Sequence, residues 1–181
     1  MQRVAVIGSG GAGKSVLSLE LGARTGLPVV HLDRLFWGPD WTPMPDDEWD
    51  DVVRGVSAGD RWIQDGNYRG TMDFRFARAD TVVFMDLPRL VCLWGAISRW
   101  LRHRNRSRPD MAPGLNDKLD LPFLQWIWNY PRDRRPELLR GLEALPPTTR
   151  VVRLTSRRAV REWLETISHA VGSGDREAAT A

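Results

Sequence analysis

Short apolar segments alternate along the chain with longer segments whose apolar residues recur at helical spacing. The apolar segments predict five strands, at residues 3–8, 27–32, 61–65, 79–86 and 149–155. The longer segments predict helices at 14–26, 47–56, 89–104 and 119–130 and after Ser156. Strands that alternate with helices are typical of a parallel sheet covered by helices on both faces. The pattern therefore predicts an α/β domain.

Polar and turn-forming residues set the expected boundaries. Gly26 suits the end of the first helix, and Asp46 and Ser156 suit the N-caps of later ones. The proline-rich segment 33–45 predicts a loop, and residues 104–118 predict a mobile one. We expect one domain over residues 1–170, with a lid at about 100–136 and a disordered tail at 171–181.

Composition narrows the class of protein. Hydrophobic residues make up 42% and charged residues 27%, which is ordinary for a globular protein. The single cysteine, Cys92, excludes an internal disulfide and suits a reducing cytoplasm. No apolar run reaches the ~18 residues that cross a bilayer. We predict a cytoplasmic protein without a membrane segment. The net charge of +3 suits a phosphorylated substrate and does not require nucleic acid.

A glycine-rich segment follows the first predicted strand. Its sequence, GSGGAGKS, matches the phosphate-binding pattern G-x-x-x-x-G-K-[ST]. Glycines let backbone N–H groups surround an anion, and the start of the next helix adds a positive dipole end. The chain has 26 basic residues, but only Lys14 and Lys118 are lysines, so a lysine here indicates a compact cation for phosphate. The alternative is a glycine turn without a ligand. The predicted phosphate-binding residues are Gly8, Ser9, Gly10, Gly11, Ala12, Gly13, Lys14, Ser15 and Val16.

The polar residues that follow the other strands predict a magnesium site and an acceptor site. Ser15 and Asp65 are the candidates to hold the Mg²⁺ of Mg-ATP, Asp65 through a water. Alternatively, Asp65 and Gly66 form an ordinary turn. Asp33 suits a general base for a hydroxyl acceptor, whereas a phosphate acceptor would need arginines such as Arg34 and Arg69. The alternative role for Asp33 is a helix cap.

Several segments resemble known kinases. The segment DGNYR, residues 65–69, resembles the D-G-F-P-R motif of nucleoside monophosphate kinases, with Asn67 and Tyr68 in place of Phe and Pro. The segments HLDRLFW, WIQDGNYR, ADTVVFMDLPR, RPD and WIWNYPR resemble the adenylate-kinase-related group known as DNA topology modulation proteins, across almost the whole chain. The resemblance implies a kinase core, an acceptor site over Asp33 and Asp65, and a lid with arginines.

From the motif and the resemblance together we expect a P-loop NTPase fold, with a five-stranded parallel sheet in the order 2-3-1-4-5 and a helical lid. The expected acceptor-binding residues are Asp33, Arg34, Trp37, Asp65, Gly66, Asn67 and Arg69. Trp37, with Phe36 and Trp41, is a candidate stacking wall for a ring; ordinary packing is the alternative.

An arginine-rich segment completes the predicted site. Arg99, Arg102 and Arg106 fall on one helical face, and Arg132 and Arg135 follow the next helix. The expected catalytic residues are Lys14, Asp33, Arg99, Arg132 and Arg135, with the three arginines clamping the transferred phosphoryl group. Solvated surface arginines are the alternative.

The sequence thus predicts transfer of the γ-phosphoryl of Mg-ATP to a small acceptor, a nucleotide or nucleoside. One alternative is a small-molecule kinase for a polyol or sugar. Others are a nucleotide-dependent regulatory module and a nucleic-acid-binding protein that uses the arginines.

Overall fold

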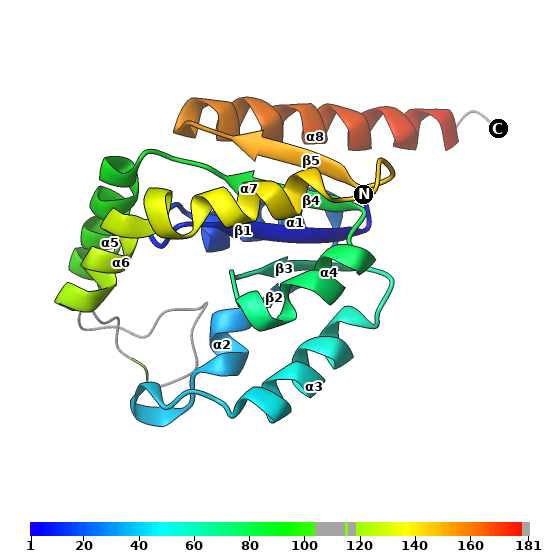
Figure 1. Ribbon diagram of the computed structural model, residues 1–181. Coiled ribbons are helices and arrows are strands. Elements are labelled where there is room, and N and C mark those ends of the chain that lie inside the picture. The colour runs from blue at the N-terminus through cyan, green and yellow to red at the C-terminus, as the bar shows by residue number, and fades with distance from the viewer. Residues whose placement is uncertain (104–114, 116–118, 179–181) are drawn as a thin grey trace.

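The computed structural model describes residues 1–103, Leu115 and residues 119–178. Five parallel strands form one sheet in the order β2-β3-β1-β4-β5, which confirms the predicted fold class and strand order (Figure 1). The strands are β1 (Arg3–Gly8), β2 (Val29–His31), β3 (Trp62–Asp65), β4 (Thr81–Met85) and β5 (Arg150–Leu154).

Helices cover both faces of this sheet (Figure 1). They are α1 (Lys14–Thr25), α2 (Leu32–Phe36), α3 (Asp46–Ser57), α4 (Met72–Arg78), α5 (Arg89–His103), α6 (Leu121–Asp133), α7 (Arg135–Glu143) and α8 (Arg157–Ala178), with short 3₁₀ turns η1 (Pro39–Trp41) and η2 (Arg69–Thr71). Along β1, Val4 and Val6 pack with α1 and α8, whereas Ala5 and Ile7 pack with α4 and α7. Successive side chains of a strand point to opposite faces, so a strand buried on both sides is apolar throughout.

The carboxyl ends of the strands lie toward α5 and α6 (Figure 1). The glycine-rich segment leaves β1 at this edge, and Asp33 and Asp65 follow β2 and β3 there. In open α/β sheets ligands bind beyond the carboxyl ends of the strands. The fold therefore brings the predicted phosphate and acceptor sites to one edge.

Several predicted boundaries are corrected. Helix α2 and turn η1 occupy the expected loop 33–45, and α4 has no counterpart in the sequence prediction, because elements of three to seven residues are too short to show a clear period. Asp46 is the first residue of α3 rather than its cap; Pro45 precedes it with φ −55°, a value that leads into a helix. Ser156 does cap α8, since its Oγ accepts the N–H of Ala159 at 3.0 Å.

The C-terminal segment also differs from its prediction. Helix α8 continues to Ala178, where the sequence predicts a disordered tail from residue 171. Extending an existing helix is easier than starting one, so polar and glycine residues after 171 do not end it. Of the predicted mobile loop, residues 104–114 and 116–118 lie outside the described residues, and with them Arg104, Arg106 and Arg108. Within the described residues, no helix combines the length and the apolar character that a membrane crossing needs.

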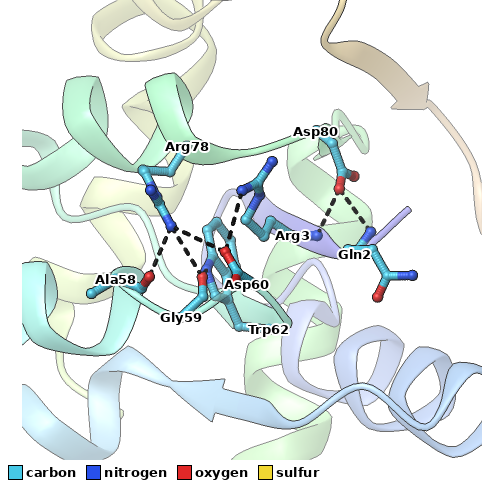
Figure 2. Close-up of polar contacts among 8 residues, drawn as sticks. All are labelled: Gln2, Arg3, Ala58, Gly59, Asp60, Trp62, Arg78 and Asp80. Carbon is cyan, nitrogen blue, oxygen red and sulfur yellow. Dashed lines mark hydrogen bonds and ion pairs between the residues drawn. The ribbon is translucent and has the colours of Figure 1, made fainter.

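The amino ends of the strands are closed by a polar cluster on the opposite edge of the sheet (Figure 2). The Asp80 carboxylate accepts the backbone N–H groups of Gln2 at 2.7 Å and Arg3 at 2.9 Å. Burial acts to raise the pKa of Asp80, but these hydrogen bonds outweigh it and hold the pKa below its ordinary value. Arg78 donates to the carbonyls of Ala58 and Gly59 in the turn before β3. This edge holds the sheet together and lies away from the candidate site.

Candidate functional site

The loop between β1 and α1 has a backbone that only glycine accommodates easily. Gly11 and Gly13 have φ values of 71° and 97°, in the left-handed region. A Cβ on Gly11 would lie 2.0 Å from the Cys92 carbonyl oxygen of α5. Left-handed residues directly before a helix are typical of loops that present N–H groups to an anion.

Lys14 is the first residue of α1 and turns back over this loop. Its Nζ donates to the carbonyl oxygens of Gly8 at 3.0 Å and Ser9 at 3.2 Å. Burial lowers the pKa of Lys14, while the carboxylates of Asp33 and Asp65 act to raise it. The lysine is therefore held on the loop and shares the cavity with both carboxylates that follow the neighbouring strands.

A cavity of about 690 Å³ lies over the loop. This volume falls within the range of small-molecule sites. The lining residues are Gly10, Gly11, Gly13, Lys14, Ser15, Val16, Asp33, Trp37, Trp41, Asp65, Gly66, Asn67, Tyr68, Gly95, Ser98, Arg99, Arg102, Asp120, Pro122, Phe123, Trp126 and Arg157.

Asp65 is a buried carboxylate at the floor of the cavity. Its Oδ1 lies 2.9 Å from Nδ1 of His31, which is the residue opposite it in the pairing of β2 with β3. Its Oδ2 is buried and has no hydrogen-bond partner among the described residues. A divalent cation such as Mg²⁺ takes carboxylate oxygens, so this oxygen and the Ser15 hydroxyl, which lines the same cavity, fit the predicted magnesium ligands.

Asp33 lies in the first turn of α2 and is exposed to the cavity. Its Oδ1 accepts the Tyr68 hydroxyl at 2.7 Å. Burial and the Asp33 carboxylate both raise the pKa of Tyr68, which keeps the phenol protonated as a donor. The residue at the N-cap position of α2 is His31, so Asp33 does not cap this helix. Its position is that of a carboxylate open to a ligand.

Asn67 supports the glycine loop from the neighbouring strand. Its Nδ2 donates to the Gly8 carbonyl at 2.8 Å, and its Oδ1 accepts the Gly8 N–H at 3.0 Å. Beneath it, the fully buried Arg75 donates to the Gly66 carbonyl at 3.1 Å and to Gln64. Burial lowers the pKa of Arg75 to about 10. The sequence analysis assigned Asn67 to the acceptor site and missed Arg75. Nothing in the sequence around Arg75 distinguishes a buried arginine from one on the surface.

The predicted arginines divide into two groups. Arg99 and Arg102 of α5 line the cavity, together with Arg157 of α8, which the sequence pattern did not single out. Arg157 directly follows the Ser156 cap, and that position after the last strand is the only signal that could have found it.

The second group does not line the cavity: it consists of Arg34, Arg69, Arg132 and Arg135. Arg69 pairs with Glu137 of α7, and the exposed Arg132 pairs with its neighbour Asp133. Arg135 makes two hydrogen bonds, of 2.8 and 2.9 Å, to the Asp86 carboxylate after β4. Arg69, Arg132 and Arg135 pair with carboxylates outside the cavity lining, so the structure does not bring Arg132 and Arg135 into the predicted clamp.

Asp86, directly after β4, ties helix α7 and the edge strand β5 to the end of β4. Besides Arg135 it accepts Nε of Arg153 at 2.8 Å. Burial acts to raise the pKa of Asp86, but the hydrogen bonds from these two arginines hold it below its ordinary value. Asp86 therefore stays ionised as a structural anchor.

Comparison with solved structures identifies the fold. The shikimate kinase from Bacteroides thetaiotaomicron aligns with a TM-score of 0.56 at 14% identity, covering 94% of this chain and 98% of the other. The shikimate kinase from Acinetobacter baumannii, in complex with shikimate, aligns with a TM-score of 0.55 at 15% identity over 96% and 94%. The chain has the fold of a P-loop kinase.

A gluconokinase from Sinorhizobium meliloti 1021 shares this fold, with a TM-score of 0.51 at 17% identity over 97% of each chain. No protein-family model matches the sequence, and no curated protein does. The neighbours therefore establish the fold, and the roles of the residues around the cavity rest on their geometry.

Proposed function

We propose that the protein is an ATP-dependent phosphotransferase, which moves the γ-phosphoryl group of Mg-ATP to a small acceptor. One observation carries the proposal: the glycine loop with Lys14 opens into the same cavity as the carboxylates Asp33 and Asp65. A phosphate donor held on the loop would thus face an acceptor held beside Asp33. The solved neighbours, named as shikimate kinases and a gluconokinase, support a kinase of small molecules.

Several residues that line the cavity have a role in this proposal. The loop N–H groups and Lys14 bind the phosphates, and Arg99 balances the charge that develops on the transferred group. Ser15 and Asp65 would hold Mg²⁺, which neutralises charge on the β- and γ-phosphates when bound. Asn67 fixes the backbone of Gly8 and so keeps the loop in place.

Asp33 acts as the general base in the proposed reaction. The acceptor oxygen forms a bond to the γ-phosphorus as the bond from that phosphorus to the β,γ-bridging oxygen breaks. The hydroxyl proton passes to the Asp33 carboxylate, and ADP leaves with the electron pair of the broken bond. The hydrogen bond from Tyr68 orients Asp33 for this transfer.

The sequence resemblance to the adenylate-kinase-related group known as DNA topology modulation proteins favours a nucleotide or nucleoside as the acceptor. Of the residues expected to bind the acceptor, Arg34 and Arg69 do not line the cavity; those that do are Asp33, Trp37, Asp65, Gly66 and Asn67.

Two variants test the proposal. Lys14→Ala should weaken Mg-ATP binding, measured by calorimetry, by about tenfold or more, because a charged contact to phosphate is lost. Asp33→Asn should lower acceptor-dependent ADP release by roughly 10²–10⁴-fold with little change in ATP affinity. Asp51→Asn, an exposed carboxylate on α3, is the matched control.

The proposal is contradicted if the wild type does not bind Mg-ATP, or if Lys14→Ala binds it with the same affinity as the wild type. If Asp33→Asn and the wild type have equal acceptor-dependent turnover, Asp33 is not the general base of the reaction.

A further inference from the structure

The segment 36–43 forms an aromatic wall beside Asp33. Trp37 and Trp41 both line the cavity, with ring centroids 5.5 Å apart. Phe36 supports Trp37 from behind at 4.9 Å and itself packs on Trp49 at 5.0 Å. Trp37 and Trp41 are half-buried rather than part of the core, so both rings keep surface for a ligand.

The backbone holds this wall in an unfavourable conformation. Asp40 and Trp41 have φ values of 56° and 61°, and they are the non-glycine residues with left-handed φ among those that the structure describes. Such strain persists only where surrounding contacts enforce it, and it gathers at ligand sites. Here Gly38 N–H donates to the Thr42 carbonyl at 2.8 Å and closes the turn, which aims the Trp41 ring at the cavity.

The charges on this side of the cavity are negative. Among the described lining residues, those from segments 33–41 and 65–68 include the carboxylates of Asp33 and Asp65 and no lysine or arginine. The lining arginines come from α5 and α8, on the other wall. Arg69, which could have brought a cation to the acceptor, is paired with Glu137.

We propose that the acceptor is an uncharged alcohol that carries a flat ring, of which a nucleoside is the type, and that its ring stacks on Trp37 and Trp41. The proposal rests on the phosphotransfer function above and names its substrate class. A phosphate or carboxylate beside Asp33 and Asp65 would be repelled, and no described side chain of that wall compensates it. Lys14, the lining lysine that interacts with both carboxylates, is held on the loop by the Gly8 and Ser9 carbonyls and serves the donor phosphates in the proposed function. An aromatic base gains from stacking whatever its identity.

The experiment compares matched acceptors that differ in charge. ADP release from Mg-ATP is measured with adenosine, guanosine, cytidine and thymidine, with their 5′-monophosphates, and with shikimate and gluconate. We expect at least one nucleoside to have a kcat/KM about tenfold or more above that of its own monophosphate and of both acids.

Variants of the wall give a second readout. Trp41→Ala should lower kcat/KM for that nucleoside by about tenfold, mainly through KM, and Trp41→Phe should restore most of it, because stacking needs only a flat ring. Trp94→Ala removes an exposed tryptophan of α5 that does not line the cavity, and it serves as the control. Melting temperatures establish that the variants are folded.

The outcomes separate the two proposals. If a monophosphate or an acid is phosphorylated in preference to the nucleosides, the proposed substrate class is wrong and the proposed phosphotransferase function stands. An unchanged kcat/KM in Trp41→Ala overturns the stacking wall. Absence of transfer to every compound overturns the substrate class, and absence of Mg-ATP binding as well overturns the phosphotransferase itself.

Discussion

The contact between α5 and the glycine loop gives a quantitative prediction. Gly95 lies within α5, and a Cβ placed on it would stand 2.1 Å from the Gly11 carbonyl oxygen. Ordinary van der Waals contact begins near 3.4 Å, so helix and loop must separate by more than an ångström to accept an alanine. The obstacle is backbone, which no change of rotamer can relieve.

Two opposing effects decide the size of the change in Gly95→Ala. Alanine is favoured over glycine inside a helix by about 1 kcal/mol. Overpacking against an unyielding neighbour costs about 1–3 kcal/mol, and the close approach to backbone places this site at the upper end. We expect a net loss of about 2 kcal/mol in the free energy of unfolding, together with weaker Mg-ATP binding because the loop is displaced.

Gly55→Ala is the matched control, since Gly55 lies in α3 and a Cβ added to it would have nothing within 4 Å. It should raise the free energy of unfolding by about 0.5–1 kcal/mol. Urea denaturation of the two variants and the wild type measures both changes. If Gly95→Ala is as stable as Gly55→Ala and binds Mg-ATP as the wild type does, the packing argument is wrong.

Three further substitutions test other contacts. Asn67→Ala removes both hydrogen bonds to Gly8, so the free energy of unfolding should fall by about 1–3 kcal/mol and Mg-ATP should bind more weakly. An unchanged affinity for Mg-ATP in calorimetry would refute the role of Asn67 in supporting the loop. Asp86→Asn should destabilise the protein at pH 7 and much less at pH 3. The native pKa of Asp86 is lowered, so its contribution is present above about pH 4 and fades as the pH falls through the native pKa. Denaturation midpoints that differ equally at both pH values would contradict this. Arg99→Ala should lower kcat by about 10³-fold while the exposed Arg158→Ala changes it little, and equal rates in the two variants would remove Arg99 from the reaction.

The elements that the sequence predicted well are those with local signals. The glycine pattern is contiguous and lies between an apolar strand and an amphipathic helix, so the loop and its lysine follow from neighbouring residues. The strand order followed from the fold that the motif and the resemblance imply. The sequence also predicted that Asp33 and Asp65 lie in the same site, because the carboxyl ends of parallel strands meet at one edge of the sheet.

The contacts that sequence reasoning missed depend on partners far along the chain. Asn67 pairs with Gly8, 59 residues away, and Arg135 pairs with Asp86, 49 residues away. An arginine can pair equally well with a phosphate and with a carboxylate, so which partner it binds depends on what the fold places beside it. The left-handed backbone conformation falls on Asp40 and Trp41, which are not glycines, so the sequence does not indicate it. That the Trp41 ring lines the cavity is seen only in the folded chain.

Among the residues that the structure describes, the amino-end cluster and the cavity share no side chain. The amino-end cluster around Asp80 and Arg78 uses none of the residues that line the cavity (Figure 2). Substitutions in the amino-end cluster therefore change the stability of the fold without altering a side chain that lines the cavity. A change in that cluster thus alters thermal stability and leaves the residues that would meet a substrate as they are.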